Sequence, residues 1–340
     1  MATSASDGGT RPTMTDVAAA AGVSLKTVSR VVNAEPGVTD ETAARVREAI
    51  ELLGFRRNYV ARALRRGLRF RMLGLVIEDV GNPFYSAIAR GVEEVTRERG
   101  LLLLTGSSDE DPARERELAR VFCERRVDGL LVVPAGEDHR YLLPELRAGM
   151  HAVFIDRPPG NIEADAVLLD NVGGARQAAD HLVGRGHRRI AMVVDHMAIF
   201  TQRERWRGFC DALAAAGAPI DDTLVRFGVH DTVAAEQATA ELLSLASPPT
   251  AVFAANNRIT IGVLRALAAH GSDLEVVGFD DVELAELLAR PLTTVSYDTA
   301  ELGRRAAELL AQRLEGDASP PQRVILPTTL LVRSAGEVLA

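Results

Sequence analysis

The sequence predicts an α/β protein with a small, purely helical module at its N-terminus. From residue 72 onward, short apolar runs alternate with amphipathic helical stretches, which indicates parallel sheets covered by helices on both faces. Residues 13–54 instead carry only helical patterns, punctuated by glycines and capping residues. Charge divides at the same place, because residues 1–71 hold 12 of the 39 Lys and Arg but only 7 of the 47 Asp and Glu.

Composition sets the broad class of the protein. The 340 residues are 47% hydrophobic and 25% charged, as in ordinary globular proteins, and the length predicts two or three domains. The longest apolar runs are too short for a transmembrane helix, and the first residues, which we expect to form a disordered tail over 1–12, lack a signal-peptide pattern. The net charge is −8, but a basic module on an acidic body predicts a polyanionic partner for the module alone.

The first two predicted helices form a helix-turn-helix. Thr13 can cap the first helix, and Asp16 can complete a box-like cap three residues later. Gly22 ends this helix, since a tight turn there requires a residue free of Cβ strain. Ser24 then caps a second helix over Leu25–Val32. Two short helices joined by a glycine-containing turn are typical of this motif.

The second helix is the expected reader of DNA. In a helix-turn-helix it enters the major groove, and its N-terminal residues meet base edges. Lys26, the only lysine in the chain, could reach guanine or a phosphate there, although a solvated surface lysine is the alternative. The DNA-contacting residues expected in this module are Thr13, Ser24, Leu25, Lys26, Thr27, Ser29, Arg30 and Asn33.

A third helix and a linker complete the N-terminal region. The pattern predicts a helix over Asp40–Leu53, capped by Thr39 and ended by Gly54, and the DNA-binding module therefore spans 13–57. The following "FRRNYVARALRRG" could form a short helix from about Tyr59, within a linker over 58–71.

The body of the chain, 72–340, reads as two α/β lobes with a cleft between them, because its strands are too many for one comfortable sheet. Ligands of such folds bind beyond the carboxyl ends of the strands. The expected strands are 72–78, 101–105, 130–134, 152–156, 166–170, 190–194, 223–228, 251–255 and 275–280, with a late one at Thr293. The expected helices include 87–99, 114–125, 174–184 and 206–216.

Three segments, "DVAAAAGVSLKTVSRVVN", "VTDETAARVREAIELLGF" and "NYVARAL", give a specific resemblance to the DNA-binding headpiece of the lactose/galactose-repressor (LacI/GalR) family. The resemblance implies that the last segment is a hinge helix, paired with its copy from a second subunit in the minor groove. A leucine wedge there would bend the duplex. This chain has Arg57 where the family usually has proline. The hinge residues implied to contact DNA are Asn58, Tyr59, Ala61 and Leu64, with linker packing as the alternative for Leu64.

The body resembles the same family through "DVGNPFYSAIARG", "RERWRGFCDALAAAG", "AVFAANNRITIGVL" and "VVGFDDVELA". The resemblance implies a periplasmic-binding-protein-like pair of lobes that senses a small effector and carries the dimer interface. Asp oxygens would accept from paired hydroxyls, an Arg would donate to them, and an aromatic ring would cover an apolar face. The effector-binding residues implied by position are Phe84, Tyr85, Asp156, Arg203, His230, Asn256 and Asp280.

Together these patterns predict a cytoplasmic, nucleoid-associated transcription regulator, most simply a homodimeric repressor of carbohydrate-utilisation genes that binds a palindromic operator. The expected effector is a sugar, with a nucleoside or nucleobase as the alternative, and a tetramer is the alternative assembly. No cofactor, metal or membrane partner is expected. A solute-binding protein and an α/β enzyme are competing hypotheses, but the sequence offers no nucleophile–base set, P-loop or G-x-S-x-G motif.

Overall fold

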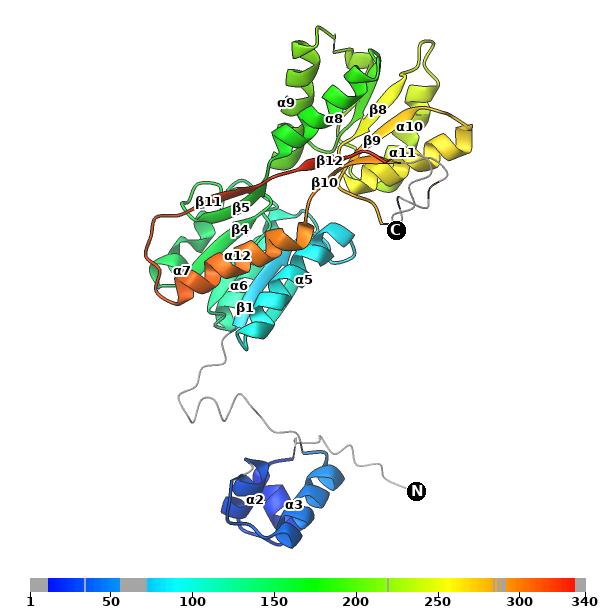
Figure 1. Cartoon of the computed structure of the whole chain (residues 1–340). Helices are drawn as coiled ribbons and strands as arrows, with labels where there is room; N and C mark the ends of the chain where they lie inside the picture. The colour runs from blue at the N-terminus through cyan, green and yellow to red at the C-terminus, as the bar shows by residue number, and fades with distance from the viewer. Residues whose placement is uncertain are drawn as a thin grey trace, which may run out of the picture. The chain divides into compact units, whose positions relative to one another are not determined.

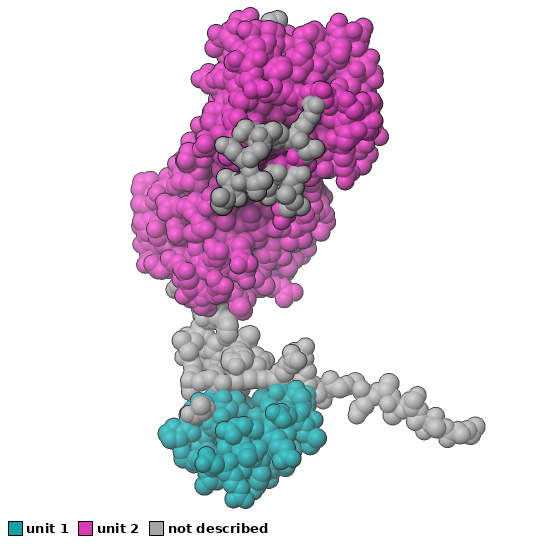
Figure 2. Space-filling view, turned by 45° about the vertical axis from the view of Figure 1, so that its right-hand side comes forward, with its two compact units in different colours: residues 1–70 teal, residues 71–340 magenta. Residues whose placement is uncertain are grey.

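The computed structural model describes residues 12–33, 35–55, 72–218, 220–283, 285, 288 and 292–333. The chain divides into two compact units, residues 1–70 and 71–340 (Figure 2). No helix among the described residues is both long enough and apolar enough to cross a membrane.

The described part of the first unit contains three helices, α1 (Met14–Ala21), α2 (Leu25–Val32) and α3 (Asp40–Leu53), with the predicted bounds for α2 and α3. Their apolar faces close a small core, and Arg45 of α3 donates to the carbonyl of Ala21 at 2.7 Å, which ties α3 to the end of α1. The buried core residues are Val17, Ala18, Ala21, Val28, Val46 and Ala49.

The caps of these helices follow the sequence prediction. Thr13 and Asp16 form a capping box at the start of α1, and Gly22 ends it with a left-handed φ of 66°. The Ser24 hydroxyl accepts from the backbone N–H of Thr27 at 3.1 Å and so caps α2. The predicted hinge helix near Tyr59 lies outside the described residues.

The second unit has two lobes, each built on a six-stranded sheet (Figure 1). The first sheet has the order β11-β5-β4-β3-β1-β2 and is parallel throughout. Its strands are β1 (Met72–Ile77), β2 (Leu102–Ser107), β3 (Gly129–Val132), β4 (His151–Ile155), β5 (Asp165–Leu169) and β11 (Arg323–Leu326). The helices that pack with this lobe include α5 (Pro83–Glu98), α6 (Pro112–Glu124), α7 (Leu143–Arg147) and α12 (Thr299–Leu314).

The second sheet repeats this arrangement in the order β12-β10-β9-β8-β6-β7, with β12 antiparallel to β10. Its strands are β6 (Ile190–Val193), β7 (Val225–Arg226), β8 (Ala251–Ala254), β9 (Glu275–Phe279), β10 (Thr293–Ser296) and β12 (Thr329–Leu331). Its helices are α8 (Asn171–Gly184), α9 (Phe200–Ala215), α10 (Thr232–Leu243) and α11 (Asn257–His270). The predicted α/β architecture with two lobes is confirmed.

The chain crosses between the lobes after β5, after β10 and after β11, so that each lobe is completed by residues distant in sequence. In Figure 1 the run from β11 to β12 passes from one sheet to the other beside the crossing that follows β10. Gln177 of α8 bonds both the carbonyl of Thr328 and the N–H of Leu330, which anchors this crossing. Such connections leave the lobes able to change their angle while they remain tied together.

Several predicted bounds are wrong, for identifiable reasons. The helices expected from residues 87, 114 and 174 begin at 83, 112 and 171 instead. A capping residue followed by proline at N1 starts both α5 and α6, and Asp170 caps α8. The helix expected from 206 begins at Phe200, where no side chain caps it. The strand expected over 223–228 shrinks to two residues, since Asp222–Leu224 is a 3₁₀ turn capped by Asp221. Strands β11 and β12 were too short and too close to prolines to stand out.

Candidate functional site

A pocket lies between the two lobes of the second unit, and we call it the central pocket. It sits where strands of both sheets end, so the residues just past β1, β4, β8 and β9 converge on it. Its lining from the first lobe is Glu78, Asn82, Phe84, Tyr85, Asp156 and Arg157. Its lining from the second lobe is Asp195, Ile199, Thr201, Gln202, Arg205, His230, Asn256, Asn257, Arg258 and Asp280.

Two aspartates occupy equivalent places in the two lobes. Asp156 follows β4 with φ of 68°, and Asp280 follows β9 with φ of 71°. Aspartate is one of the few residues other than glycine that adopts this left-handed conformation, and such strain is typical of functional sites. The backbone N–H of each donates to the next strand, Asp156 to Val167 at 2.8 Å and Asp280 to Val295 at 3.1 Å. The sheets therefore fix both carboxylates at the pocket.

Asp156 is an incompletely satisfied acceptor. The residue is 3% exposed, and its Oδ1 has no hydrogen-bond partner among the residues that the structure describes. Burial raises the pKa of Asp156 to about 6, against the opposing field of Arg157. A buried polar atom without a partner is rare in folded proteins, so this oxygen points to a donor that arrives with a ligand.

Asp280 is held by a ring of donors. The Tyr297 hydroxyl and the backbone N–H of Asn257 both donate to its carboxylate, the latter at 3.2 Å. The guanidinium of Arg205 lies 3.6 Å away. Burial raises the pKa of Tyr297 well above its usual value, so that hydroxyl keeps its proton.

Arg205, not Arg203, supplies the guanidinium of the central pocket, while Arg203 lies in the neighbouring cavity, so a contact of Arg203 with an effector stays a prediction. Arg205 is 3% exposed, donates from Nε to Asn171 Oδ1 at 2.8 Å and from Nη1 to the carbonyl of Ala255 at 2.6 Å. Its guanidinium also lies 3.6 Å from the centre of the Phe279 ring.

Helical periodicity places the two arginines in different cavities. Residues 203 and 205 both lie near the start of α9, but they point about 200° apart around its axis. Phe209 and Ala212 are buried on α9, and positions four and seven residues before them lead to Arg205. That spacing was available in the sequence and identifies the inward arginine.

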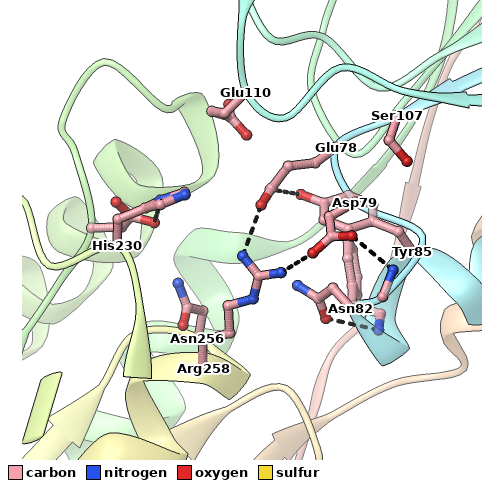
Figure 3. A network of polar contacts seen from close by, with 12 residues as sticks. Glu78, Asp79, Asn82, Tyr85, Ser107, Glu110, His230, Asn256 and Arg258 are labelled. Atoms are coloured by element: carbon pink, nitrogen blue, oxygen red, sulfur yellow. Dashed lines mark hydrogen bonds and ion pairs between the residues drawn. The ribbon is translucent and has the colours of Figure 1, made fainter. Parts of the chain in front are cut away.

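A network of charged side chains joins the lobes across the pocket (Figure 3). Arg258, in the first turn of α11, lies 3.3 Å from Glu78 and is hydrogen-bonded to Asp79, both of which follow β1. Beside it, Asn257 Nδ2 donates to Asn82 Oδ1 at 2.8 Å. These contacts fasten the second lobe to the first.

Glu78 is the buried member of that network. The Tyr85 hydroxyl donates to it at 2.6 Å, and burial together with the nearby Glu110 raises the pKa of Glu78 to about 7. Arg258 therefore partners a carboxylate that is costly to keep ionised. With the cross-lobe bridges in place, the central pocket encloses only about 40 Å³, which is room for a few water molecules.

The other predicted effector residues also line the central pocket. His230 lies 3.0 Å from Asp195, and this hydrogen bond raises the pKa of His230. Asn256 caps α11 by accepting from the Ile259 N–H at 2.8 Å. Phe84 packs edge-on against Tyr85, with ring centres 4.8 Å apart. Thus six of the seven positions converge, and their contact with an effector stays a prediction.

A second cavity, which we call the outer chamber, adjoins the central pocket and shares Arg157 and Ile199 with it. It encloses about 500 Å³ between the lobes. Arg203 lies here, where it donates to the carbonyls of Met197 and Ala198 and pairs with Glu137 of the first lobe at 3.0 Å.

The predicted DNA-reading residues lie on α2 and its flanks. Leu25 is 51% exposed although it is apolar, and Ser24 and Lys26 beside it are also exposed. The first turn of α2 therefore presents a protruding apolar residue and the chain's one lysine to the outside. Thr27, Ser29, Arg30 and Asn33 are half-buried, and Thr13 is exposed at the α1 cap. The predicted hinge contacts Asn58, Tyr59, Ala61 and Leu64 lie outside the described residues.

Sequence reasoning missed the charged partners of the central pocket. Arg157, Arg258 and Glu78 belong to the pocket, but isolated charges beside a strand or helix end carry no signal of which lobe they will meet. Cys123 and Cys210 are free and half-buried, and no group of three potential metal ligands occurs among the described residues.

Comparisons with known proteins agree with this arrangement. A family model described as bacterial regulatory proteins, lacI family, matches residues 13–58, and a periplasmic binding protein-like domain matches 179–335. The transcriptional regulator CelR of Thermobifida fusca is 38% identical over 96% of this chain and 98% of its own length. A structure of a CelR–cellobiose complex superposes with a TM-score of 0.70 at 34% identity, covering 96% of this chain and all of that one. The Lac repressor dimer bound to operator and an anti-inducer superposes with a TM-score of 0.76 at 26% identity, covering 95% and 98%.

Proposed function

The chain belongs to the lacI family of bacterial regulatory proteins, and on that premise we propose that it is a homodimeric repressor of carbohydrate-utilisation genes with a sugar effector in the central pocket. It is a DNA-binding transcription regulator and not an enzyme. The open questions are therefore which ligand it senses and how that ligand acts.

The observation that carries the sugar proposal is the unpartnered Oδ1 of Asp156 in a pocket that also contains Asp280 and Arg205. Neighbouring hydroxyls of a sugar can donate to the two carboxylates and accept from the guanidinium. An uncharged polyol suits this site, because carboxylates of both lobes line it together with the guanidiniums of Arg157, Arg205 and Arg258, and hydroxyls can bond to both kinds of group. The CelR relative crystallised with cellobiose supports the same ligand class.

The homodimer follows from the DNA-binding unit. One helix-turn-helix reads only half of a palindromic operator, so a twofold partner is needed for the other half. We place Leu25 and Lys26 in the major groove and assign Asn58, Tyr59, Ala61 and Leu64 to the minor groove. The operator-bound Lac repressor dimer supports this assembly. The protein would act in the cytoplasm, on the nucleoid.

Coupling between effector and operator would run through the angle between the lobes. In the structure Arg258 joins the lobes, and the central pocket is too small for a sugar ring. A sugar must therefore part the lobes and replace these bridges with its own contacts. It can shift the equilibrium only by the difference between its affinities for the two lobe arrangements.

A thermal-shift screen of the full-length protein against neutral sugars and nucleosides tests the ligand class. We expect a neutral sugar to raise the melting temperature, and the same sugar to lose that effect with Asp280→Asn. A nucleoside that stabilises the protein while every sugar fails would overturn the sugar assignment in favour of the nucleoside alternative.

A further inference from the structure

The outer chamber is far larger than the central pocket. It encloses about 500 Å³ against about 40 Å³, and both lie between the lobes with Arg157 and Ile199 in their common wall. Pockets that enclose small organic ligands have volumes of about 300–1,000 Å³. The chamber therefore offers the room that the central pocket lacks, immediately beside the carboxylates assigned to the first sugar ring.

The wall of the chamber combines apolar surfaces with a few charged groups. Phe200 and Ile199, at the start of α9, face a proline-rich wall of the first lobe that consists of Pro112, Pro134, Pro158 and Pro159. A sugar ring has apolar C–H faces and a polar rim of hydroxyls, and this lining matches both features. The charged residues that line the chamber are Glu110, Glu137, Arg157 and Arg203, of which Glu110 and Arg157 are paired with each other.

Buried hydrogen bonds hold the two loops of that wall in place. His139 is fully buried and makes two hydrogen bonds with Gly160. Its Nδ1 accepts from the Gly160 N–H at 2.9 Å, and its backbone N–H donates to the Gly160 carbonyl at 3.0 Å. Glu115, 1% exposed, accepts from the Ala135 N–H and from the Tyr141 hydroxyl. The His139 bonds tie loop 157–160 to loop 134–140, and Glu115 ties the latter to α6, so this wall of the chamber is a preformed part of the first lobe.

Arg203 spans the chamber from the second lobe to the first. Two carbonyls, those of Met197 and Ala198, fix its guanidinium, which pairs with Glu137 at 3.0 Å. The Glu137 side chain is 74% exposed, so this ion pair is weak and a ligand hydroxyl can replace it at little cost.

We propose that the effector contains two sugar units, the second of which lies in the outer chamber against Phe200 and Arg203 while the first meets Asp156, Arg205 and Asp280. This rests on the proposed function, because it presumes a sugar in the central pocket. The ligand class is thus a neutral disaccharide or a glycoside of similar length, and a monosaccharide fills only half of the site.

Calorimetric titration of the full-length protein tests this with cellobiose, maltose, lactose and sucrose beside glucose, galactose and fructose. We expect at least one disaccharide to bind at least tenfold more tightly than its constituent monosaccharides. Phe200→Ala and Arg203→Ala should each lower the affinity for that disaccharide about tenfold and leave the affinity for the monosaccharides unchanged. Arg207→Ala is the matched control, because its exposed side chain on the same helix pairs only with Glu204 and lines neither cavity.

The outcomes separate the two proposals. Two results would overturn the proposal of a second sugar unit in the effector: a monosaccharide that binds as tightly as the best disaccharide, or a disaccharide affinity unchanged by both chamber substitutions. Either result would leave the proposal of a sugar-responsive regulator intact. The absence of binding by any sugar of either size would overturn both.

Discussion

Replacing Arg205 with alanine tests the assignment of the inward arginine most severely. The side chain is buried between Asn171, the carbonyl of Ala255 and Asp280, so its loss leaves two acceptors unpaired and one carboxylate without its cation. Unpaired buried acceptors cost about 1–3 kcal/mol each, and breaking a buried ion pair costs about 3–5 kcal/mol in all. We expect Arg205→Ala to lower the free energy of unfolding of this lobe by about 3–5 kcal/mol and to abolish effector binding.

The chain offers both a reporter and a matched control for this experiment. Trp206, the only tryptophan, lies on the same helix and packs against Phe209 and Phe227, so its fluorescence follows unfolding of that lobe in urea. Arg203→Ala removes the same residue type two positions away, where the side chain is 39% exposed. We expect that variant to lose about 1 kcal/mol or less.

The difference in stability loss between Arg205→Ala and Arg203→Ala tests whether burial distinguishes the two arginines. Asp280→Asn in the Arg205→Ala background should recover part of the lost stability, since the stranded charge is then gone. If both single variants lost the same stability, or if Arg205→Ala lost less than about 1 kcal/mol, the reasoning from burial would be refuted.

Three further predictions address the operator, the lobe angle and the buried carboxylate. Lys26→Ala should weaken operator binding by about 1–3 kcal/mol per subunit and relax the preference at one base pair, whereas unchanged binding to every operator variant in fluorescence anisotropy would reject a reading role. Arg258→Gln removes two cross-lobe ion pairs worth roughly 1 kcal/mol or less each, so small-angle scattering should show a more open ligand-free protein; an unchanged profile would contradict it. Because the pKa of Asp156 is raised from 3.8 to about 6, wild-type stability falls as pH rises between these values. Without effector, Asp156→Asn should therefore raise the free energy of unfolding by up to about 3 kcal/mol at pH 7 and leave it unchanged below pH 4. The same substitution should weaken effector binding. Equal urea midpoints for wild type and variant at pH 7 would contradict this prediction.

Local patterns predicted much of the fold. The headpiece helices were predictable because Thr13, Ser24 and Gly22 give start and stop signals that act within one turn. Most of the repeated strands were predictable because their apolar runs are buried on both faces, although β2, at the edge of its sheet, is only partly buried. Strands β11 and β12 were not predicted, because their positions depend on sheet partners distant in sequence. The start of α9 was predicted wrongly, because no capping side chain marks it.

The candidate site was predictable to the extent that it depends on strand ends. Asp156 and Asp280 follow buried strands and lie at the pocket, as expected from the chain's alternation of strands and helices. The partners that close the pocket could not be predicted, because Arg258 and Glu78 are far apart in sequence and meet only through the packing of two lobes. Helix periodicity adds Arg205 to the central pocket, whereas Arg203, which the family resemblance implied, lines the outer chamber.

The central claim is that the headpiece binds a specific DNA sequence and that a sugar in the body alters this binding. Operators selected from a random duplex library should be measured by fluorescence anisotropy with the full-length protein at fixed salt, with and without the sugar that stabilises it. We predict a palindromic site that binds at least 1,000-fold more tightly than unrelated DNA, and an affinity that the sugar changes about 5- to 150-fold. A selected site bound no better than random duplex, or an operator affinity indifferent to a sugar that demonstrably binds, would contradict the account.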